Sequence, residues 1–553
     1  MQLRSLPHRL LLATGATLLV VAPLSAGLAA ATPNPTGTTW TGGKPLPPAP
    51  GLGLHRNEDG EPGMGVTPSG QYWIASDIAP YAADDPRVDP VAGVLSGADI
   101  WTSTDGGKSY KWVADPFAEA QNSFGLAGED TDLAVATAKN SKGFYNVYAT
   151  SLWIGASGLA WSSDGGKTWQ LNRLGGTPTQ DRPWLAADGP CTVYLGFHQL
   201  PSFTPVFDSY DVCSNGNVPT GTGAALDPVN ETQLTASDFP GLSGSFNKFV
   251  VDTSPTSRFR HNLYQPMSVC KTQSETDLLT NATASNCPQG TQYIVAVSSD
   301  RGQTFSYHPV VLDKSGATLV WAATVATDAA GKVYFTWSDS KNVYLNTSSN
   351  GGKTWSPSHK LNLSGTAAVY PTVAGGGSGR VDVAWYGTPR AGDSNDAKKM
   401  GKPTRKGSAP WAVYVAPSTN GGKNFTIRKV TGTIHLGVLC THGSGCNSDG
   451  SRNLLDDFGI AISPKTGLDS ISYTADMPTG VPGKAFTGFT TEQGPVQRVA
   501  AGSRLPAPRT AAGGGGGGGG SALAATGAPV GLSIGGASLL VLGLALRRRL
   551  TAA

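Results

Sequence analysis

The chain has 553 residues, including 73 glycines and 39 prolines, and only 14% of its residues are charged. Frequent glycine and proline with few charges are typical of turn-rich secreted β proteins. The formal net charge of +3 is close to neutral for this length, so the charge balance argues against a nucleic-acid ligand.

The first 31 residues predict a secretory signal peptide. Arg4 and Arg9 precede an apolar run that leads into small residues, and we expect cleavage between Ala29 and Ala31. No twin-arginine pair occurs, which favours the general export route. A membrane anchor is the less favoured alternative, because the apolar run is short and ends in an Ala-rich stretch. We expect residues 32–44 to form a linker.

Five octets with one pattern recur along the chain. They are STDGGKSY from Ser103, SSDGGKTW from Ser162, SSDRGQTF from Ser298, SSNGGKTW from Ser348 and STNGGKNF from Ser418. A short β-like run precedes each octet. Asp or Asn fixes a turn by accepting backbone hydrogen bonds, and Gly supplies a positive φ. Strand, fixed turn and aromatic strand, repeated at about the length of a four-stranded sheet, predict an all-β propeller.

The pattern S/T-x-D-x-G-x-x-W/F of these octets resembles the Asp box of the sialidase-like β-propellers. The resemblance covers roughly residues 45–500 and implies four-stranded antiparallel blades. In that family the box lies between the third and fourth strands of a blade, on the face away from the active site. The resemblance therefore implies structural rather than catalytic roles for Asp105, Asp164 and Asp300.

The spacing of the octets predicts seven blades. The interval between the octets at Ser162 and Ser298 is long enough for two blades, and it holds a degenerate copy, CSNGN, at 213–217. A further unit without an octet, FGIAISPKTGLDSISYT, begins at Phe458. Sialidases proper have six blades, so six is the alternative count.

The cysteine spacing is typical of an exported protein with disulfides. The six cysteines form three pairs of sequence neighbours: Cys191 with Cys213, Cys270 with Cys287, and Cys440 with Cys446. Six cysteines permit fifteen pairings, but neighbour pairs would each close a loop inside one blade, which favours that set. Metal ligation is disfavoured, because no CxxC or nearby His cluster accompanies them.

The propeller arrangement predicts that function lies on the face opposite the octets, where the long loops and the starts of the inner strands meet. The long insertions are 78–99, 197–211, 265–292 and 387–410. The polar residues expected at the starts of inner strands are Glu61, Glu129, Asp130, Asp132, Asp181, Arg182, Tyr370, Asp456 and Asp457.

Such an acidic ring, with one arginine and one tyrosine, suits carbohydrate hydroxyls or a divalent cation, so calcium stays open as a ligand. No other cofactor is indicated. The alternative interpretation is that these residues cap strands or join neighbouring blades by hydrogen bonds. For Arg182 alone, the structural role is favoured.

The sequence does not assign an enzymatic activity. Sialidases use three arginines, a tyrosine nucleophile paired with Glu, and an Asp acid/base. Their F/Y-R-I-P phrase is absent here, where the first unit reads NEDGEPGMGVTP. Arg182, Arg258, Arg260, Arg390 and Arg452 match no such motif, and neither Tyr370 nor Tyr386 is distinguished as a nucleophile. Three hypotheses stay open: a surface propeller that recognises extracellular glycan or another surface ligand, which is preferred; an exo-glycosidase or lyase using the axial carboxylates; and a protein-binding adhesion or structural surface protein.

The C-terminal residues 523–553 resemble a sortase cell-wall sorting signal. The Gly-rich linker 501–522 leads into Leu523, Ala524, Ala525, Thr526 and Gly527, and then into an apolar stretch and three arginines. The LAxTG form is similar to that used by class E sortases of high-GC Gram-positive bacteria. The resemblance implies sortase and cell-wall peptide as partners and cleavage after the threonine. A plain C-terminal membrane anchor is the alternative, and either interpretation places the propeller outside the cell.

One basic stretch, KKMGKPTRK from Lys398, is confined to a single loop. We interpret it as a solvated segment or a contact with the wall rather than a nucleic-acid site.

The sorting signal predicts how the mature protein is held. We expect the mature chain to end at Thr526 joined to wall peptide, and a muramidase rather than a detergent to release it. Thr526→Ala should leave the protein in the membrane fraction or the medium, as shown by blotting of cell fractions. Release of the unaltered protein by detergent alone would reject the signal in favour of an ordinary anchor.

Overall fold

The computed structural model describes residues 38–48, 59–78, 98–117, 127–153, 156–175, 180–199, 204–213, 228–234, 247–270, 290–315, 323–403, 405–442, 446, 449–477 and 486–494. The expected signal peptide, the Gly-rich linker and the LAATG tail lie outside these residues. So does the proposed Cys270–Cys287 disulfide, because only the backbone of Cys270 is described. Among the described residues, no helix is long and apolar enough to cross a membrane.

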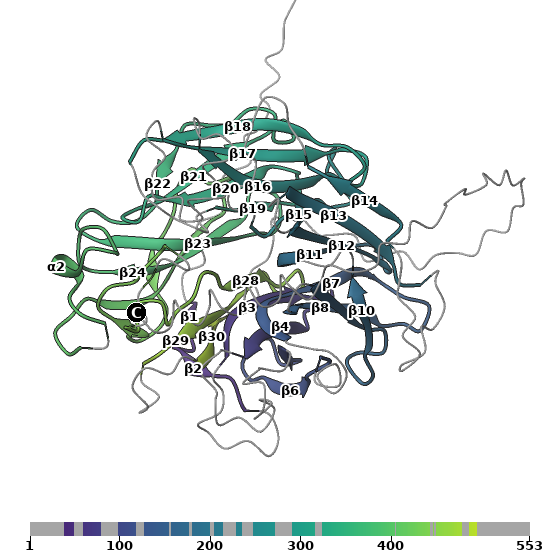
Figure 1. Cartoon of the computed structure of the whole chain (residues 1–553), viewed down its shortest axis with the longest axis horizontal. Coiled ribbons are helices and arrows are strands. Elements are labelled where there is room, and N and C mark those ends of the chain that lie inside the picture. The colour runs from purple at the N-terminus through teal and green to yellow at the C-terminus, as the bar shows by residue number, and fades with distance from the viewer. Residues whose placement is uncertain are drawn as a thin grey trace, which may run out of the picture.

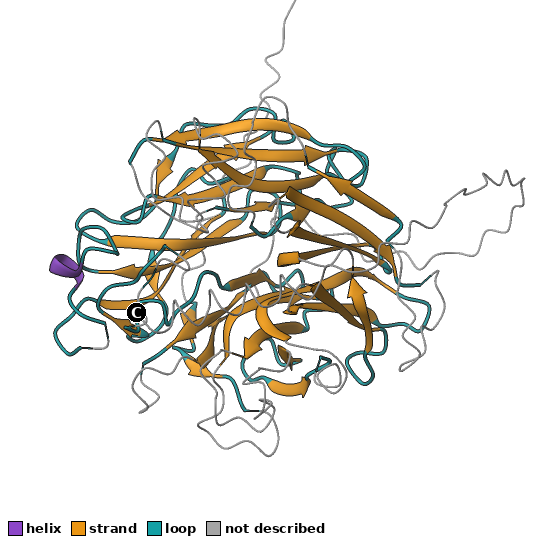
Figure 2. Ribbon diagram, in the orientation of Figure 1, coloured by secondary structure: helices purple, strands orange, loops and turns teal. Residues whose placement is uncertain are grey.

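The strands form seven antiparallel sheets around a common axis, which confirms a seven-bladed β-propeller (Figures 1 and 2). Blade 1 contains β3 (Asp59–Val66), β4 (Tyr72–Ile78), β5 (Ala98–Ser103) and β6 (Lys111–Ala114). Blade 2 contains β7 (Ala127–Lys139), β8 (Tyr145–Trp153), β9 (Ala156–Ser162) and β10 (Gln170–Gly175). Blade 3 contains β11 (Gln180–Asp188), β12 (Thr192–Gln199), β13 (Thr204–Asp211) and β14 (Asn230–Gln233).

The next three blades follow the same order, each from its inner to its outer strand. Blade 4 contains β15 (Val250–Val251), β16 (Leu263–Cys270), β17 (Thr291–Ser298) and β18 (Ser306–Asp313). Blade 5 contains β19 (Thr324–Thr327), β20 (Val333–Ser338), β21 (Val343–Ser348) and β22 (His359–Lys360). Blade 6 contains β23 (Ala367–Gly375), β24 (Val381–Thr388), β25 (Pro410–Ser418) and β26 (Arg428–Lys429), and β27 (His435–Leu436) also pairs with β25.

Blade 7 combines both ends of the described chain. Its strands β28 (Gly459–Ile462), β29 (Asp469–Ala475) and β30 (Phe486–Gln493) are joined by β1 (Thr39–Trp40), which pairs with β30, and by β2 (Lys44–Pro45), which pairs with β30 further along. The prediction of a linker over 32–44 is therefore wrong for Thr39, Trp40 and Lys44, which are paired in this blade. Two-residue strands give almost no periodic pattern, and their outer edge position needs no apolar alternation.

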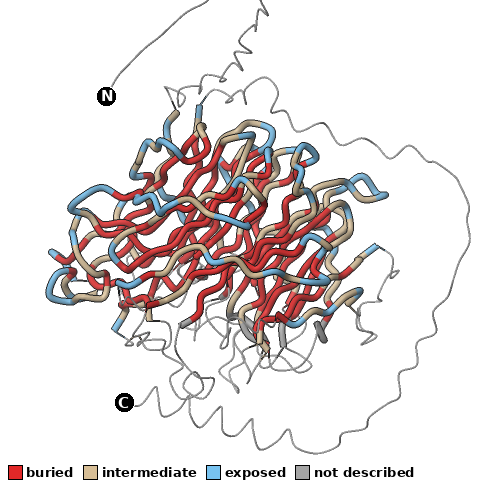
Figure 3. The backbone as a smooth tube through the Cα atoms, turned by 90° about the horizontal axis from the view of Figure 1, so that it is seen from above, coloured by how far each residue is buried: buried red, intermediate tan, exposed pale blue. Residues whose placement is uncertain are grey.

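Apolar side chains pack between neighbouring blades, so the core is divided into a series of layers. Figure 3 shows that the buried residues follow the strands through the body of the molecule. Between blades 2 and 3, for example, Tyr148 and Trp161 lie in one cluster with Leu185 and Val193. Strands covered on both faces show nearly continuous burial, as in β24, whose eight residues are all buried. The helical content of the described residues is the single turn α2 (Ala397–Met400).

All five octets lie between the third and fourth strands of a blade, as predicted. They follow β5, β9, β17, β21 and β25 in blades 1, 2, 4, 5 and 6. We refer to this side of the propeller as the octet face and to the opposite side as the loop face. The degenerate copy begins at the expected place in blade 3, after β13, and its remaining residues lie outside the described part.

The hydrogen bonds of the blade 2 octet show why its residue types recur. Ser162 Oγ donates to Asp164 Oδ1 (2.9 Å) and accepts from the amide of Gly166 (2.8 Å). The amides of Lys167 and Thr168 both donate to Asp164 Oδ1 at 3.0 Å. Burial opposes ionisation of Asp164, but the hydrogen bonds from Thr168 and Ser162 outweigh it and hold the pKa of this carboxyl below its usual value.

Three of the four expected insertions are second-to-third strand connections on the loop face. They join β4 to β5, β16 to β17, and β24 to β25. The prediction of an insertion over 197–211 is wrong, because this range is mostly the paired strands β12 and β13. This strand is covered on both faces, because successive side chains point to opposite sides and Val206 and Phe207 are buried in different layers between blades.

Two of the predicted disulfides are formed. Cys191–Cys213 staples the turn before β12 to the end of β13 within blade 3, with the Cα atoms 5.5 Å apart. Cys440–Cys446 closes a shorter loop, with a Cα separation of 5.9 Å, but it lies in the connection from blade 6 to blade 7 rather than inside one blade.

The octet network predicts a graded response to substitution at Asp164. Asp164→Ala should lower the free energy of unfolding by about 1–2 kcal/mol, because two turn amides lose their acceptor. Asp164→Asn should lose less, since Asn350 fills the same place in blade 5 and accepts from the Thr354 amide at 3.0 Å. Denaturant unfolding of the three proteins would measure this.

The pH dependence of the same variants provides an internal check. A carboxyl whose pKa is lowered in the folded state stabilises the protein above its unfolded pKa, and this contribution is lost as the pH falls. The advantage of Asp164 over Asn should therefore shrink below about pH 4. Thr104→Ala, a change at an exposed octet position, serves as the control. Equal stability of Asp164→Ala and wild type at neutral pH would contradict the structural role.

Candidate functional site

The inner strands open on the loop face with residues in the left-handed backbone conformation. The non-glycine residues with this conformation at these positions are Glu61 (φ 44°), Asp130 (φ 44°), Arg182 (φ 59°), Tyr370 (φ 51°) and Leu455 (φ 57°). In blades 1, 2, 3 and 6 the pairing register between the first two strands shifts at this point, which marks a bulge. Such residues cost of order 1–3 kcal/mol each and cluster at ligand-binding and catalytic sites.

These bulges belong to a cluster of charged groups that we call the axial cluster. It consists of Glu61, Asp132, Arg182, Lys248, Tyr370, Arg452, Asp456 and Asp457, which come from blades 1, 2, 3 and 6 and from the segments that enter blades 4 and 7. No two of these residues except the last pair are adjacent in sequence. The propeller fold brings them together.

Asp456 is the centre of one half of the axial cluster. Its carboxylate forms an ion pair with Arg452, lies 4.0 Å from Arg182 Nη1, and accepts a hydrogen bond from the Tyr370 hydroxyl at 3.4 Å. Its backbone amide donates to Glu61 Oε1 at 3.0 Å. Blades 1, 3, 6 and 7 therefore meet at a single aspartate.

Lys248 is the centre of the other half. Its ammonium lies 3.2 Å from Asp132 Oδ1 and 3.0 Å from Asp457 Oδ2, and it sits 5.2 Å from the centre of the Trp184 ring. The other oxygen of Asp132 accepts from the amide of Leu185 at 2.9 Å. One cation thus holds two carboxylates from blades that are not neighbours.

Burial shifts the protonation of several of these groups. Burial, followed by repulsion from Asp130 and Asp456, raises the pKa of Glu61 well above its usual value. Burial also raises the pKa of Asp457 to about 6, against the opposing effect of Lys248. Burial lowers the pKa of Lys248, but the attraction of Asp132 and Asp457 exceeds this effect, and the net shift is upward. Burial therefore disfavours the charged form of Glu61, whereas the neighbouring carboxylates favour the charged form of Lys248.

The charges of the axial cluster are layered with respect to solvent. The carboxylate side chains of Asp456, Asp132 and Asp457 are only 4%, 5% and 8% exposed. The cationic side chains are 18% exposed for Arg182, 20% for Lys248 and 29% for Arg452. The cationic side chains are therefore the groups of the cluster that are most accessible to a ligand from solvent.

Six predicted site residues are brought together: Glu61, Asp132, Arg182, Tyr370, Asp456 and Asp457. Asp130 lies at the edge of the same group, where its charge acts on Glu61. Asp181 and Glu129 are placed only as backbone in β11 and β7, and their side chains lie outside the description. Among these residues, Asp456 has contacts that cross from blade to blade, as the interpretation of a link between blades requires.

Sequence reasoning missed Lys248, and it left Arg452 without a role. A weak signal for Lys248 was present, because in FNKFVVD of blade 4, as in QDRPWLAAD of blade 3, a cation directly precedes the buried residues of the inner strand. For Arg452 no strand pattern was available, since it lies in the irregular segment between β27 and β28.

The other candidate arginines and the second tyrosine do not reach this cluster. Arg258 donates to the carbonyl of Ser349 on the octet face, and Arg390 donates to Lys399 O in the loop before β25. The Tyr386 hydroxyl accepts from the amide of Thr474 at 3.1 Å in the core. The cluster therefore contains two arginines and one lysine rather than three arginines.

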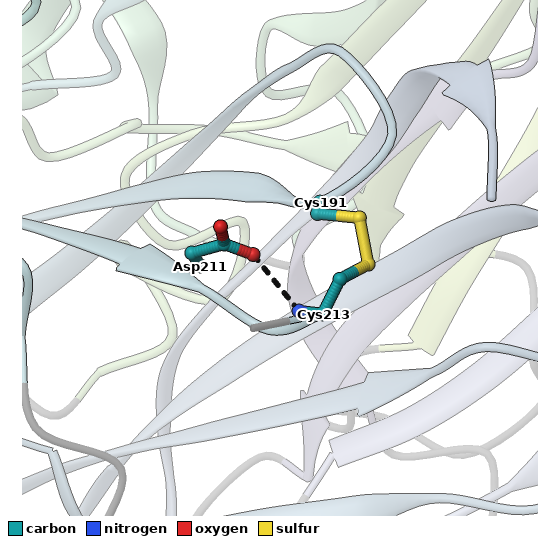
Figure 4. Close-up of side chains that lie close together, drawn as sticks. All are labelled: Cys191, Asp211 and Cys213. Carbon is teal, nitrogen blue, oxygen red and sulfur yellow. Dashed lines mark hydrogen bonds between the residues drawn. A yellow bond between two sulfur atoms is a disulfide. The ribbon is translucent and has the colours of Figure 1, made fainter. Parts of the chain in front are cut away.

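One group of described residues has metal-ligating atoms within reach of one another, namely Cys191, Asp211 and Cys213 (Figure 4). Its two sulfur atoms are joined in the disulfide, and the Cys213 amide donates to Asp211 Oδ1 at 2.9 Å. These contacts make it a structural staple rather than a metal site.

Comparisons with known proteins do not assign the chain to a family. No protein-family model matches it, and no curated protein matches it. Weak likenesses exist among solved structures. A Dyadobacter fermentans protein of unknown function is 14% identical over 83% of this chain and 99% of that chain, with a TM-score of 0.40. A leech intramolecular trans-sialidase is 13% identical over 83% and 71%, with a TM-score of 0.37, and a Fusarium graminearum α-L-arabinofuranosidase is 15% identical over 83% and 98%, with a TM-score of 0.38.

The raised pKa of Asp457 predicts how stability varies with pH. Because the folded pKa lies at about 6, above the unfolded value, the contribution of this carboxyl is full at low pH and is lost as the pH rises through about 6. Asp457→Asn should remove this decline, so its unfolding midpoint should change less than that of wild type between about pH 4 and pH 7. Denaturant unfolding at several pH values would measure it.

Two further variants serve as a control and as a second test of this prediction. Asp449→Asn removes an exposed carboxyl outside the axial cluster and should follow the wild-type pH profile. Lys248→Ala should lower the free energy of unfolding by about 3–5 kcal/mol at neutral pH, because two buried carboxylates lose their shared cation. Parallel pH profiles for wild type and Asp457→Asn would contradict the assignment of a buried, proton-binding Asp457.

Proposed function

We propose that this chain is an extracellular glycan-recognising propeller whose binding site is the axial cluster. The observation that carries the proposal is the convergence of inner-strand bulges, with Glu61, Arg182 and Tyr370 in the left-handed conformation, on one layered group of charges. Backbone strain repeated at one place in several blades is typical of a site that positions side chains for a ligand.

The chemistry of the axial cluster suits sugar hydroxyls. A hydroxyl both donates and accepts, so it can accept from Arg182, Lys248 or Arg452 while donating to a carboxylate below. Three cationic groups, Arg182, Lys248 and Arg452, lie against the three aspartates of the cluster, so these charges are close to balanced. Such a balance favours a polar, hydroxyl-rich ligand over a free metal ion.

We also propose that the propeller lies outside the cell. The Cys191–Cys213 and Cys440–Cys446 disulfides support folding in an oxidising compartment. The expected signal peptide and the LAATG tail support export followed by attachment to the cell wall, with sortase and wall peptide as partners.

A glycosidase activity is the second candidate, and it is favoured by Asp457. This carboxyl has a pKa of about 6 and shares Lys248 with Asp132, so the two carboxyls have different environments around one cation. Glycosidases use such pairs as acid and base. A tyrosine nucleophile is not favoured, because Tyr370 is buried and its hydroxyl donates to the Cys440 carbonyl at 3.1 Å.

A glycan array combined with a panel of chromogenic glycosides tests both candidates. Wild type should bind a subset of the glycans, and Arg452→Gln should lower the affinity for them about tenfold or more, since it removes the most exposed charged donor. The melting temperature should fall, because Asp456 loses its closest cation while it keeps Arg182 and Tyr370 as partners, so affinities are compared at a temperature at which both proteins are folded. Arg258→Gln removes an exposed arginine from the octet face and should leave binding unchanged.

The outcomes separate the hypotheses. Turnover that is lost in Asp457→Asn would support the glycosidase. Binding without turnover would support recognition alone. No binding to any glycan, or equal binding by wild type and Arg452→Gln, would overturn the axial cluster as a glycan site. Arg182→Ala should lower stability, by about 1–3 kcal/mol, more than it lowers affinity.

A further inference from the structure

A concentration of positive charge lies on the loop face, away from the axial cluster. Residues 398–406, which we call the basic loop, contain five cations and no acidic residue: Lys398, Lys399, Lys402, Arg405 and Lys406. All five are exposed. Because the whole chain has a net charge of only +3, these five residues leave the rest of the chain net negative. Positive charge is therefore concentrated in this loop.

The basic loop is held in place by the fold. Met400 is fully buried in the core beside blade 6, and its carbonyl accepts from the amide of Ala409 at 2.7 Å. The amide of Val438 donates to the carbonyl of Gly401 at 3.0 Å. Arg390 donates to the carbonyls of Lys399 and Gly407, which ties the two ends of the loop together. A ligand would therefore meet charges that are already positioned, and the entropy lost on binding is reduced.

The nearby carboxylates do not neutralise these cations. Asp396 caps α2 by accepting from the Lys398 amide at 2.9 Å. Asp393 accepts from the Ser340 hydroxyl at 3.1 Å and from the Asn395 side chain at 2.9 Å. Among the described residues, none of the five cations of the basic loop forms an ion pair within 4.0 Å. Their charge is available to an external partner.

The residue types of the basic loop identify the chemistry of that partner. It contains no aromatic residue on which nucleobases could stack, and its one large apolar side chain, Met400, is buried and cannot enter a membrane. Four of its five cations are lysines, which act as hydrated point charges and accept anions in varied geometry. A flexible chain with repeated negative groups fits this surface better than a rigid duplex or a lipid bilayer.

We propose that the basic loop is a docking surface for an acidic polysaccharide. The loop lies at the outer edge of blade 6, marked by α2 in Figure 1, and it joins β24 to β25 on the loop face. It would hold the polymer by its repeated negative charges, independently of any sugar bound in the axial cluster. This inference does not depend on the proposed function, because the two surfaces share no residue.

The chain offers a matched control for this proposal. Four exposed lysines, Lys108, Lys167, Lys353 and Lys423, lie in octets on the opposite face. Changing these four to glutamine, or changing Lys398, Lys399, Lys402 and Lys406 to glutamine, alters the net charge of the protein by the same amount. The two quadruple variants therefore differ only in where the charge is lost.

Binding would be measured with dextran sulfate and polygalacturonate as probes and neutral dextran as the blank. Wild type should bind both acidic polymers and not the neutral one. The basic-loop variant should raise the Kd about tenfold or more, and the octet variant should leave it within about twofold. Raising the ionic strength from about 0.1 M to about 1 M, which shortens the Debye length from about 10 Å to about 3 Å, should weaken binding of wild type.

Several results would overturn the proposal. These are equal loss in the two quadruple variants, equal binding of neutral dextran, and tighter binding of a short DNA duplex or of vesicles with anionic lipid than of either acidic polymer. Arg452→Gln should keep the wild-type Kd for the acidic polymers. If wild type bound none of the glycans but still bound the acidic polymers, the proposed function would be rejected and this docking surface supported.

Discussion

The pairing of β1 with β30 closes the ring, and the rest of the molecule depends on it. Thr39 and Trp40 lie opposite Gln493 and Glu492, so residues more than 450 positions apart become the outer edge of one blade. Closure places blade 7 against blade 1, where the Asp456 amide meets Glu61 Oε1 and the Glu61 amide meets Thr474 Oγ1. Without closure, Asp456 would have no partner from blade 1, and the axial cluster would open at one side.

The axial cluster combines two features that each destabilise a fold. Left-handed residues such as Glu61 and Tyr370 cost backbone energy, and buried carboxylates such as Asp457 cost solvation energy. Both are tolerated because the surrounding blades determine the geometry from several directions. Lys248 illustrates this, since it offsets two carboxylates from separate blades with one charge. A group held in this way is preorganised before any ligand arrives.

The sequence predicted the architecture well, because the information for it is local. An octet such as SSDGGKTW specifies its turn through hydrogen bonds within five residues, so five copies were enough to place five blades. The pairing of β1 could not be found in this way, since a two-residue strand has no pattern and its partner lies at the far end of the chain.

Only part of the axial cluster could be predicted from the sequence, because local patterns locate some of its residues and not others. Residues at the start of regular inner strands, such as Arg182 and Tyr370, could be placed by counting from the buried run. Lys248 precedes a strand of only two residues, and Arg452 lies in an irregular segment, so neither could be placed by strand period. The contacts between residues of different blades depend on closure of the ring. No local sequence pattern encodes closure, so these contacts could not be predicted.

The direction of β30 has a consequence for orientation. It is the third strand from the axis in its blade, so it runs from the loop face to the octet face and delivers Gln493 to the octet side. Any tether that attaches beyond residue 494 therefore pulls on the octet face. A propeller held by its C-terminal end would be attached at the octet face. The axial cluster and the basic loop, which lie on the loop face, would then point away from the support.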